Sequence, residues 1–127
     1  MIVINKDETF RFSFMPESWY ARLSSVKTPE KLLACTLHLL RKNPNLVSTE
    51  DIAETIQTFS DHFGFQIKVV DYSDSSITDW YEKFSDPQDL LSCVTYYCNQ
   101  KSIKPIDVLK LIKSYEKIFI LSWDALN

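Results

Sequence analysis

The chain has 127 residues, of which 45% are hydrophobic and 24% are charged, with a net charge of −3; these ordinary values predict one globular domain over residues 1–127. Its single glycine, Gly64, compares with an average expectation of about nine, which argues against the glycine-rich loops that hold phosphates and dinucleotides and favours helices joined by short polar turns. No apolar run approaches the roughly 20 residues of a membrane span, and the first residues lack the basic start and apolar length of a signal peptide, so we expect a cytoplasmic protein without a membrane partner.

Two short strands and a short helix are expected at the start of the chain. Residues 2–4 are β-branched, and residues 9–14 alternate between polar and apolar types, which is typical of a half-buried strand. The polar residues between the two stretches are expected to turn a hairpin. Residues 17–26 are then predicted to form a short helix with Trp19 and Leu23 on one side.

The first long helix has clear signals at both ends. Thr28 is a favourable N-cap, Pro29 suits the first helical position, and Glu30 places an acid in the first turn. The helix is predicted to run to about Lys42, where the Asn-Pro-Asn sequence of residues 43–45 stops it.

The second long helix begins with a capping-box pattern and ends at the glycine. Ser48 stands three residues before Asp51, which replaces the usual Glu of a capping box. Gly64 follows the last apolar residue and is predicted to close the helix in the left-handed conformation. The residues of the buried face recur at intervals of three and four: Ile52, Ile56, Phe59 and Phe63.

The middle of the chain is predicted to be less regular. Residues 65–72, with the sequence FQIKVVDY, are rich in β-branched types and indicate a strand. Residues 77–84 are predicted to form one or two turns of helix. This region therefore connects the second long helix to the remaining helices by way of a short strand.

Two further helices complete the predicted fold. Pro87 repeats the proline start for a helix to about Asn99, and Pro105 starts the last helix. Residues 118–123 contain the β-branched Ile118 and Ile120 and fit either a helix or a strand, but Asp124 continues the polar stripe of the helix. The predicted fold is mainly α, a compact bundle of about five helices with short β-strands at the N-terminus and in mid-chain, and the alternative is α+β.

Few residues carry patterns of catalysis or metal binding. The chain has no Walker, GxSxG or HExxH motif, so we expect no enzymatic activity, cofactor or metal. Cys35, Cys93 and Cys98 lack a CxxC spacing and are interpreted as buried, reduced thiols. Two alternatives stay open, a zinc site from Cys93 and Cys98 with His38 or His62, and a nucleophile pair of Cys35 with His62.

Charge is distributed unevenly along the chain. Residues 50–89 contain ten acids and two bases, which gives 2 − 10 = −8, whereas the rest of the chain has twelve bases and seven acids, or +5. Clustered carboxylates raise the rate of association with a basic partner and oppose acidic partners. The acidic segment therefore indicates a binding surface for a basic molecule.

Aromatic residues accompany the acids between residues 71 and 89. Buried aromatic anchors inside a charged rim are typical of protein interfaces. We therefore predict that Trp80 and Tyr81 act as anchors and that the surrounding acids meet Lys or Arg of a partner. The predicted partner-binding residues are Asp71, Tyr72, Asp74, Asp79, Trp80, Tyr81, Glu82, Asp86 and Asp89.

Two other interpretations of this segment are weighed against a partner-binding face. In the first, it is an ordinary solvated acidic surface with Trp80 and Tyr81 folded inward. In the second, Asp71, Asp74 and Asp79 bind calcium, although their spacing lacks the order and the glycine of an EF-hand loop.

In size, composition and glycine-poor helical character, with the acidic and aromatic segment 71–89, the chain resembles the bacterial immunity proteins of contact-dependent growth inhibition systems. The resemblance implies a stoichiometric inhibitor that neutralises the C-terminal toxin domain of a large exported protein. Such toxins are often nucleases that act on tRNA or DNA, and they are basic because their substrate is a polyanion. The expected partner is therefore a cognate, basic nuclease domain, with no direct binding of nucleic acid.

A nucleic-acid-binding regulator is the alternative function. Helices near residues 87–99 and 105–117 could form a helix-turn-helix-like pair, with a cluster of lysines around the second. The three arginines of the chain lie far from this helix, and arginine is the commonest specific reader of guanine. An enzyme with a polar pocket is a further alternative. The lysines of the cluster are Lys101, Lys104, Lys110, Lys113 and Lys117.

Overall fold

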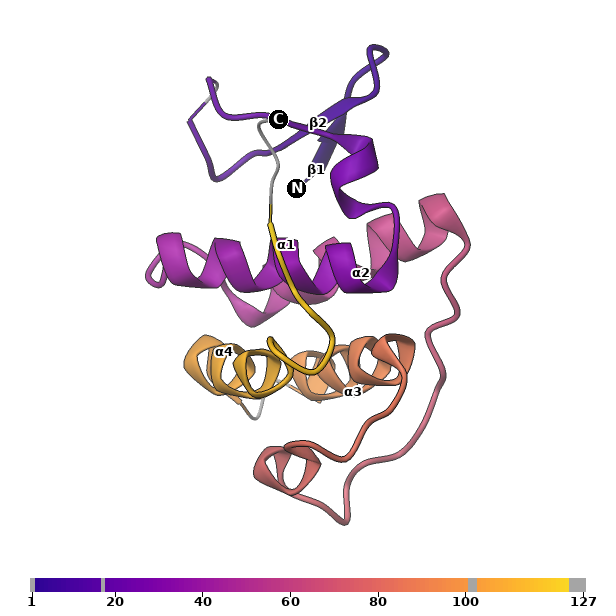
Figure 1. Ribbon diagram of the computed structural model, residues 1–127. Helices are drawn as coiled ribbons and strands as arrows, with labels where there is room; N and C mark the ends of the chain where they lie inside the picture. Colours follow the sequence, from indigo (N-terminus) through magenta and orange to yellow (C-terminus); the bar gives the residue numbers. More distant parts are fainter. Residues whose placement is uncertain (1, 17, 101–102, 124–127) are drawn as a thin grey trace.

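The computed structural model describes residues 2–16, 18–100 and 103–123. Figure 1 shows the elements stacked in layers, with a small sheet at one end, then α1 and α2, then α3 and α4, and the 71–86 connection at the opposite end. The strands are β1 (Ile2–Ile4), β2 (Thr9–Phe12) and β3 (Ala21–Arg22). The helical elements are the 3-10 helices η1 (Leu23–Val26) and η2 (Ile77–Trp80) and the α-helices α1 (Pro29–Lys42), α2 (Thr49–Phe63), α3 (Pro87–Gln100) and α4 (Pro105–Ser114).

Helices account for 51% of the described residues, which confirms the predicted fold in part. The described chain has four α-helices instead of about five, together with a three-stranded antiparallel sheet in the order β1-β2-β3. The fold therefore leans toward the α+β alternative. None of the described helices has the length and apolar character to cross a bilayer.

The N-terminal hairpin forms as predicted, but the helix expected over residues 17–26 does not. Phe10 of β2 pairs with Ile4 of β1 on one side and with Ala21 of β3 on the other. The Trp19 ring packs against Phe10 and Phe12, with ring centroids 6.1 and 5.5 Å away. This packing and the β3 pairing keep the backbone extended up to the single turn of η1; residue 17 lies outside the described residues.

The predicted signals of α1 and α2 are confirmed. Lys31 N donates to the Thr28 side chain at 3.2 Å, which caps α1. Ser48 and Asp51 form a complete capping box, each side chain accepting from the backbone N–H of the other residue. Gly64 closes α2 with a φ of 77°, in the left-handed region where L side chains are strained.

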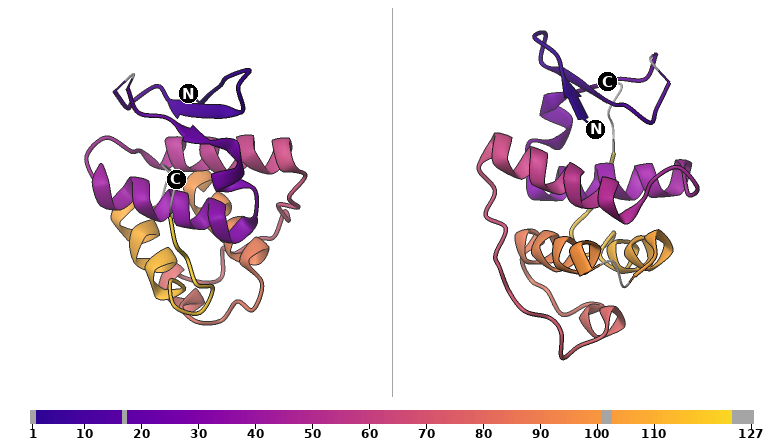
Figure 2. Two further views of the ribbon diagram at one scale, coloured as in Figure 1. Left: turned by 45° about the horizontal axis from the view of Figure 1, so that its top comes forward. Right: turned by 180° about the vertical axis from the view of Figure 1, so that it is seen from behind.

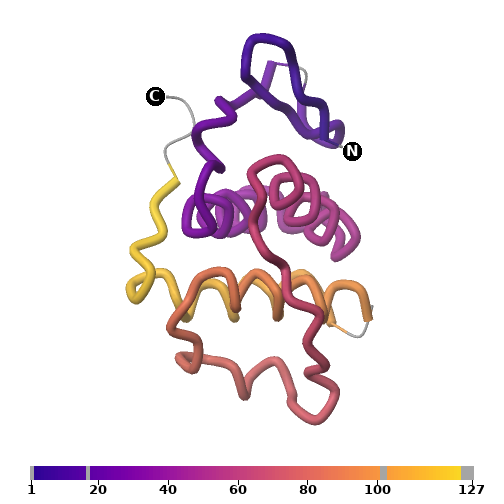
Figure 3. The backbone as a smooth tube through the Cα atoms, turned by 90° about the vertical axis from the view of Figure 1, so that its right-hand side faces the viewer, coloured from indigo at the N-terminus to yellow at the C-terminus, as the bar shows by residue number. Residues whose placement is uncertain are grey.

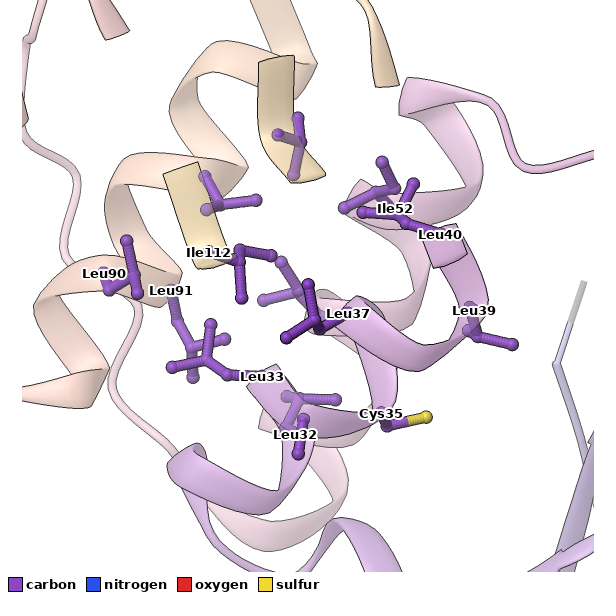
Figure 4. Close-up of a cluster of buried hydrophobic side chains, with 14 of the residues drawn as sticks. Leu32, Leu33, Cys35, Leu37, Leu39, Leu40, Ile52, Leu90, Leu91 and Ile112 are labelled. Atoms are coloured by element: carbon purple, nitrogen blue, oxygen red, sulfur yellow. The ribbon is translucent and has the colours of Figure 1, made fainter. Parts of the chain in front are cut away.

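The core is centred on α1, which contacts α2, α3, α4 and η1. Within α1, the run from Leu32 to Leu37 is buried without interruption, followed by Leu39 and Leu40. Figure 4 shows these side chains meeting Ile52 of α2 and aliphatic residues of α3 and α4. Because helices lie on several sides of α1, nearly its whole circumference is apolar.

Of the two mid-chain predictions, the strand is wrong and the helix of one or two turns is confirmed in part. Residues 65–72 form no strand and run as an extended connection along the outside of the helical layers (Figure 2). No strand lies beside them among the described residues, so they have no ladder to join. Of the helix predicted over residues 77–84, only η2 forms, and Glu82 follows it with a φ of 61°.

The last helix is shorter than predicted. α4 ends at Ser114, and residues 115–120 form successive turns, followed by irregular chain to residue 123. Ile120 has a φ of 54°, which a helix or a strand does not allow. Residues 118–123 are thus neither helix nor strand, and Asp124, which favoured a longer helix, lies outside the described residues.

Candidate protein-interaction face

The acidic segment folds into a layer that covers α3 and α4 at the end of the molecule opposite the sheet (Figure 1). We call residues 71–86 the acidic cap. Lys83 is its only basic residue, and all of its acidic residues are exposed. These are Asp71, Asp74, Asp79, Glu82 and Asp86.

Aromatic rings form the inner side of the acidic cap. Tyr72 is buried, with 6% of its surface exposed. Trp80 and Phe84 stack with ring centroids 5.2 Å apart, and the Trp80 ring meets Tyr72 edge to face at 4.9 Å. These rings pack against Tyr97 of α3 and Tyr115, the residue after α4. The cap is therefore held to the helices by a continuous aromatic layer.

The Tyr115 hydroxyl group holds the backbone of the cap in place. It accepts from Lys83 N at 2.6 Å and from Phe84 N at 2.7 Å, and it donates to Trp80 O at 2.6 Å. Burial raises the pKa of Tyr115, so the hydroxyl keeps its proton for the donated bond. One side chain thus satisfies three backbone groups of the turn that follows η2.

Tyr97 fixes the other side of the cap in the same way. Its hydroxyl group donates to Ser75 O at 2.7 Å and accepts from the Trp80 indole N–H at 3.2 Å. Burial also raises the pKa of Tyr97, and burial raises the pKa of the neighbouring Tyr72 to about 12. Tyr97 and Tyr115 each fall on the apolar face of a predicted helix. That position is the only signal in the sequence that could have indicated their role in holding the cap.

Several predicted binding acids also stabilise the local backbone. Asp71 accepts from Ser73 N at 2.8 Å and from the Tyr96 hydroxyl group at 3.1 Å, and these bonds lower its pKa. Asp79 accepts from Ser76 N at 2.7 Å at the start of η2. Asp86 accepts from Gln88 N at 2.9 Å in the first turn of α3. Local hydrogen bonds thus orient these carboxylates.

The remaining acids differ in their pairing. Asp89 forms an ion pair with Lys68, with Nζ 2.9 Å from its carboxylate oxygen. Asp74 and Glu82 form no hydrogen bond or ion pair through their carboxylates with any described residue. Lys83 Nζ lies 5.9 Å from the centroid of the Trp80 ring, where it makes a cation–π contact.

The predicted anchors lie partly inside the fold. Trp80 and Tyr81 are half-buried, and both pack against the core. In the free protein, Trp80 and Tyr81 are therefore folded inward, as in the interpretation of this segment as a solvated acidic surface. Their contact with a partner stays a prediction; the exposed residues of the cap are its five acids, Lys83, and Ser and Thr residues.

The geometry does not bring metal ligands together. Among the described residues, no three His, Cys, Asp or Glu side chains come close enough to hold a metal ion, which includes the zinc and calcium sets considered from the sequence. Cys35, Cys93 and Cys98 are buried and free, and burial raises the pKa of each thiol, that of Cys93 and Cys98 to about 12. Such thiols stay protonated at neutral pH and are poor nucleophiles.

The lysine cluster occupies a different part of the surface. Lys104 precedes α4, and its backbone N–H donates to Asp107 at 3.0 Å. Lys110, Lys113 and Lys117 are exposed along and after α4, and Lys101 lies outside the described residues. Each of α3 and α4 packs on α1.

Comparisons with protein-family models, with curated proteins and with solved structures find no match to this chain. Function is therefore inferred from the surface geometry.

Proposed function

We propose that this chain is a stoichiometric, cytoplasmic inhibitor of a basic toxin domain, an immunity protein whose acidic cap covers the cleft of a nuclease. The acidic cap supports this function most strongly. Its carboxylates are exposed, and hydrogen bonds from two buried tyrosines fix the backbone that carries them. A nuclease cleft is lined by Lys and Arg because it binds a polyanion. The carboxylates can occupy the positions of phosphates in that cleft.

The fixed backbone of the cap favours tight binding. Ordering loops and side chains on association costs free energy, and a surface that is already ordered avoids much of this cost. Tyr97 and Tyr115 order the cap before any partner is present. Asp74 and Glu82, whose carboxylates have no described partner, can form new ion pairs without breaking old ones.

The test first asks whether the gene next to that of this chain encodes a large exported protein, and it uses the C-terminal domain of that protein as the toxin domain; absence of such a gene would argue against the proposal. Glu82→Lys reverses one charge of the acidic cap, and Glu8→Lys is its matched control on the hairpin at the opposite end. Both glutamates are exposed and have positive φ values, 61° and 64° respectively. We expect Glu82→Lys to lower the association rate several-fold at low salt and to reduce protection of cells, while Glu8→Lys leaves both unchanged.

The outcomes separate the function from the site. If the wild-type chain neither binds nor neutralises the toxin domain, the inhibitor function is wrong. If it neutralises the toxin domain but Glu82→Lys and Glu8→Lys behave alike, another face makes the contact. A titration with DNA or RNA at low salt completes the test, because clear binding would favour the regulator alternative.

A further inference from the structure

A second hollowed surface lies beside the acidic cap, between α2, α3 and the 65–71 connection. We call it the side groove. It has a volume of about 630 Å³ and is lined by α2 at Gln57 and Asp61 and by the side of α3 that carries Tyr96. A smaller hollow of about 370 Å³ continues it along α2 past Glu50 and Glu54. Figure 3 shows the connection crossing the outside of α3 below the end of α2.

One edge of the connection is attached to α3. Gln66 N donates to the Gln88 side chain at 3.1 Å, and Lys68 N donates to the Ser92 side chain at 2.9 Å. In an extended chain, successive N–H groups point in opposite directions. The N–H groups of Ile67 and Val69 therefore lie on the edge turned away from these two partners.

That other edge is open. Within the described chain, no backbone group of residues 66–71 is hydrogen-bonded to another backbone group. Val69 is fully exposed and Val70 is 40% exposed. The sequence here has the β-branched composition of a strand, yet the fold supplies no strand to pair with it.

Charge decides between the possible occupants. Asp61 and Asp71 line the side groove, Glu50 and Glu54 line its continuation, and the only described base in either, Lys68, is paired with Asp89. A second copy of this chain would bring the same acids face to face, which is unfavourable. An extended segment with Lys or Arg side chains matches both the charge and the open backbone edge.

We propose that the open edge formed by Ile67 and Val69, at the rim of the side groove, binds an extended, basic segment of a partner protein as an added strand. Backbone hydrogen bonds from this edge supply affinity, and the acids of the groove select basic side chains. This binding mode is independent of the inhibitor function, because it requires neither a toxin domain nor the carboxylates of Asp74 and Glu82.

The experiment titrates the full chain, labelled for NMR, with a short acetylated and amidated peptide that alternates valine and lysine. A peptide with glutamate in place of lysine is the matched control. We expect the lysine peptide to shift the amide signals of Ile67 and Val69 in a saturable way and to slow their hydrogen exchange. We expect the glutamate peptide to leave both unchanged.

Variants test the backbone bond directly. Val69→Pro removes the open N–H, and Val69→Thr keeps it with a side chain of the same branching. Because Val69 N–H donates to no described residue, we expect both variants to fold. We expect the proline alone to weaken binding about fivefold through the lost hydrogen bond. A lysine peptide with alternate N-methylated amides repeats this test from the ligand side if the proline variant does not fold.

Each contrary result overturns the proposal. Absence of saturable binding by the lysine peptide would do so, as would equal binding of the lysine and glutamate peptides. Signal changes confined to the acidic cap would place the peptide elsewhere, and unchanged affinity in both Val69→Pro and the N-methylated peptide would exclude strand pairing. Concentration-dependent dimerisation of the free chain that Val69→Pro abolishes would identify a second copy as the occupant.

Discussion

The two ends of the molecule hold non-helical chain against the helices in different ways. At the sheet end, backbone groups pair with one another, and the contact with α2 combines apolar packing, with the rings of Phe10 and Phe59 4.8 Å apart, with one hydrogen bond from Ile2 N to the Glu54 carboxylate at 3.1 Å. The acidic cap contains no strand, and hydroxyl groups of Tyr97 and Tyr115 take the place of a sheet partner for its backbone. The sheet end is thus held mainly by apolar contact, whereas the acidic cap adds specific hydrogen bonds from two tyrosine hydroxyl groups to its aromatic layer.

The difference follows from a single requirement, that backbone polar groups removed from water must be hydrogen-bonded. A sheet meets it internally, so its inner face can be entirely apolar. In an irregular segment, the buried backbone N–H and C=O groups must form hydrogen bonds with side chains. The conformation of the segment then depends on those side chains. The positions of the carboxylates in the acidic cap are therefore set by residues that are themselves hidden from a partner.

The largest effect is expected from Phe10→Ala at the sheet end. Phe10 of β2 is fully buried, and its ring packs against Trp19 and Phe59. Truncation to alanine leaves a cavity and should lower the free energy of unfolding by about 3–5 kcal/mol. Denaturant unfolding measures this loss, with the half-buried Phe14→Ala as the control expected to lose less. Hydrogen exchange in the acidic cap should change only through global unfolding; a local increase at Lys83 or Phe84 would contradict the independence of the two ends.

A smaller but more local effect is expected from Tyr115→Phe. The ring stays buried, but Phe84 N–H loses its acceptor and Lys83 N–H keeps only the longer bond to Trp80 O at 3.4 Å, which should cost about 1–3 kcal/mol. Hydrogen exchange should rise at these two amides before it rises in the sheet. Tyr20→Phe, at an exposed position near the sheet, is the control expected to change neither property. If the hydrogen exchange of Lys83 and Phe84 were the same in Tyr115→Phe as in the wild-type protein, the Tyr115 hydroxyl group would not hold the cap.

The smallest effect concerns Asp71 and pH. Hydrogen bonds from Ser73 and Tyr96 lower the pKa of Asp71 in the folded protein. Since the folded pKa lies below the unfolded one, the stabilisation is fully present above the ordinary Asp value of about 4 and is lost as the pH falls through the folded pKa. We expect Tyr96→Phe to raise the pKa of Asp71 part of the way to its ordinary value, measured by NMR titration of the carboxyl carbon. Tyr20→Phe should leave that pKa as it is, and an unchanged pKa in Tyr96→Phe would contradict the assigned hydrogen bond.

The long helices could be predicted because their signals are local. Thr28 with Pro29, Ser48 with Asp51, and Gly64 each act within one or two helical turns, and the structure confirms all of these caps. The regular spacing of apolar residues likewise reports a buried face without reference to the partner that covers it. The acidity and exposure of the cap were also visible in the sequence, since unpaired charged residues are rarely buried.

The failures concern segments whose conformation depends on distant residues. Residues 65–72 have strand-forming composition but no neighbouring strand within the described chain. Of the helix predicted over residues 17–26, residues 21–22 instead pair with β2 as β3, and Trp19 packs on Phe10 and Phe12. The last helix stops at Ser114, where Tyr115 turns to the acidic cap. Local propensity differs by too little between these states to outweigh such contacts.

What the amino-acid sequence established is thus the set of capped helices, the single glycine that ends α2, and an acidic segment on the surface. It could not establish how that segment is shaped, because the hydroxyl groups that shape it come from tyrosines 17 to 35 positions away along the chain. Folding joins these distant groups, turns the aromatic residues of the segment inward, and leaves the carboxylates outward. Within the described chain, it also leaves the backbone edge at Ile67 and Val69 without backbone hydrogen bonds, beside an acidic groove.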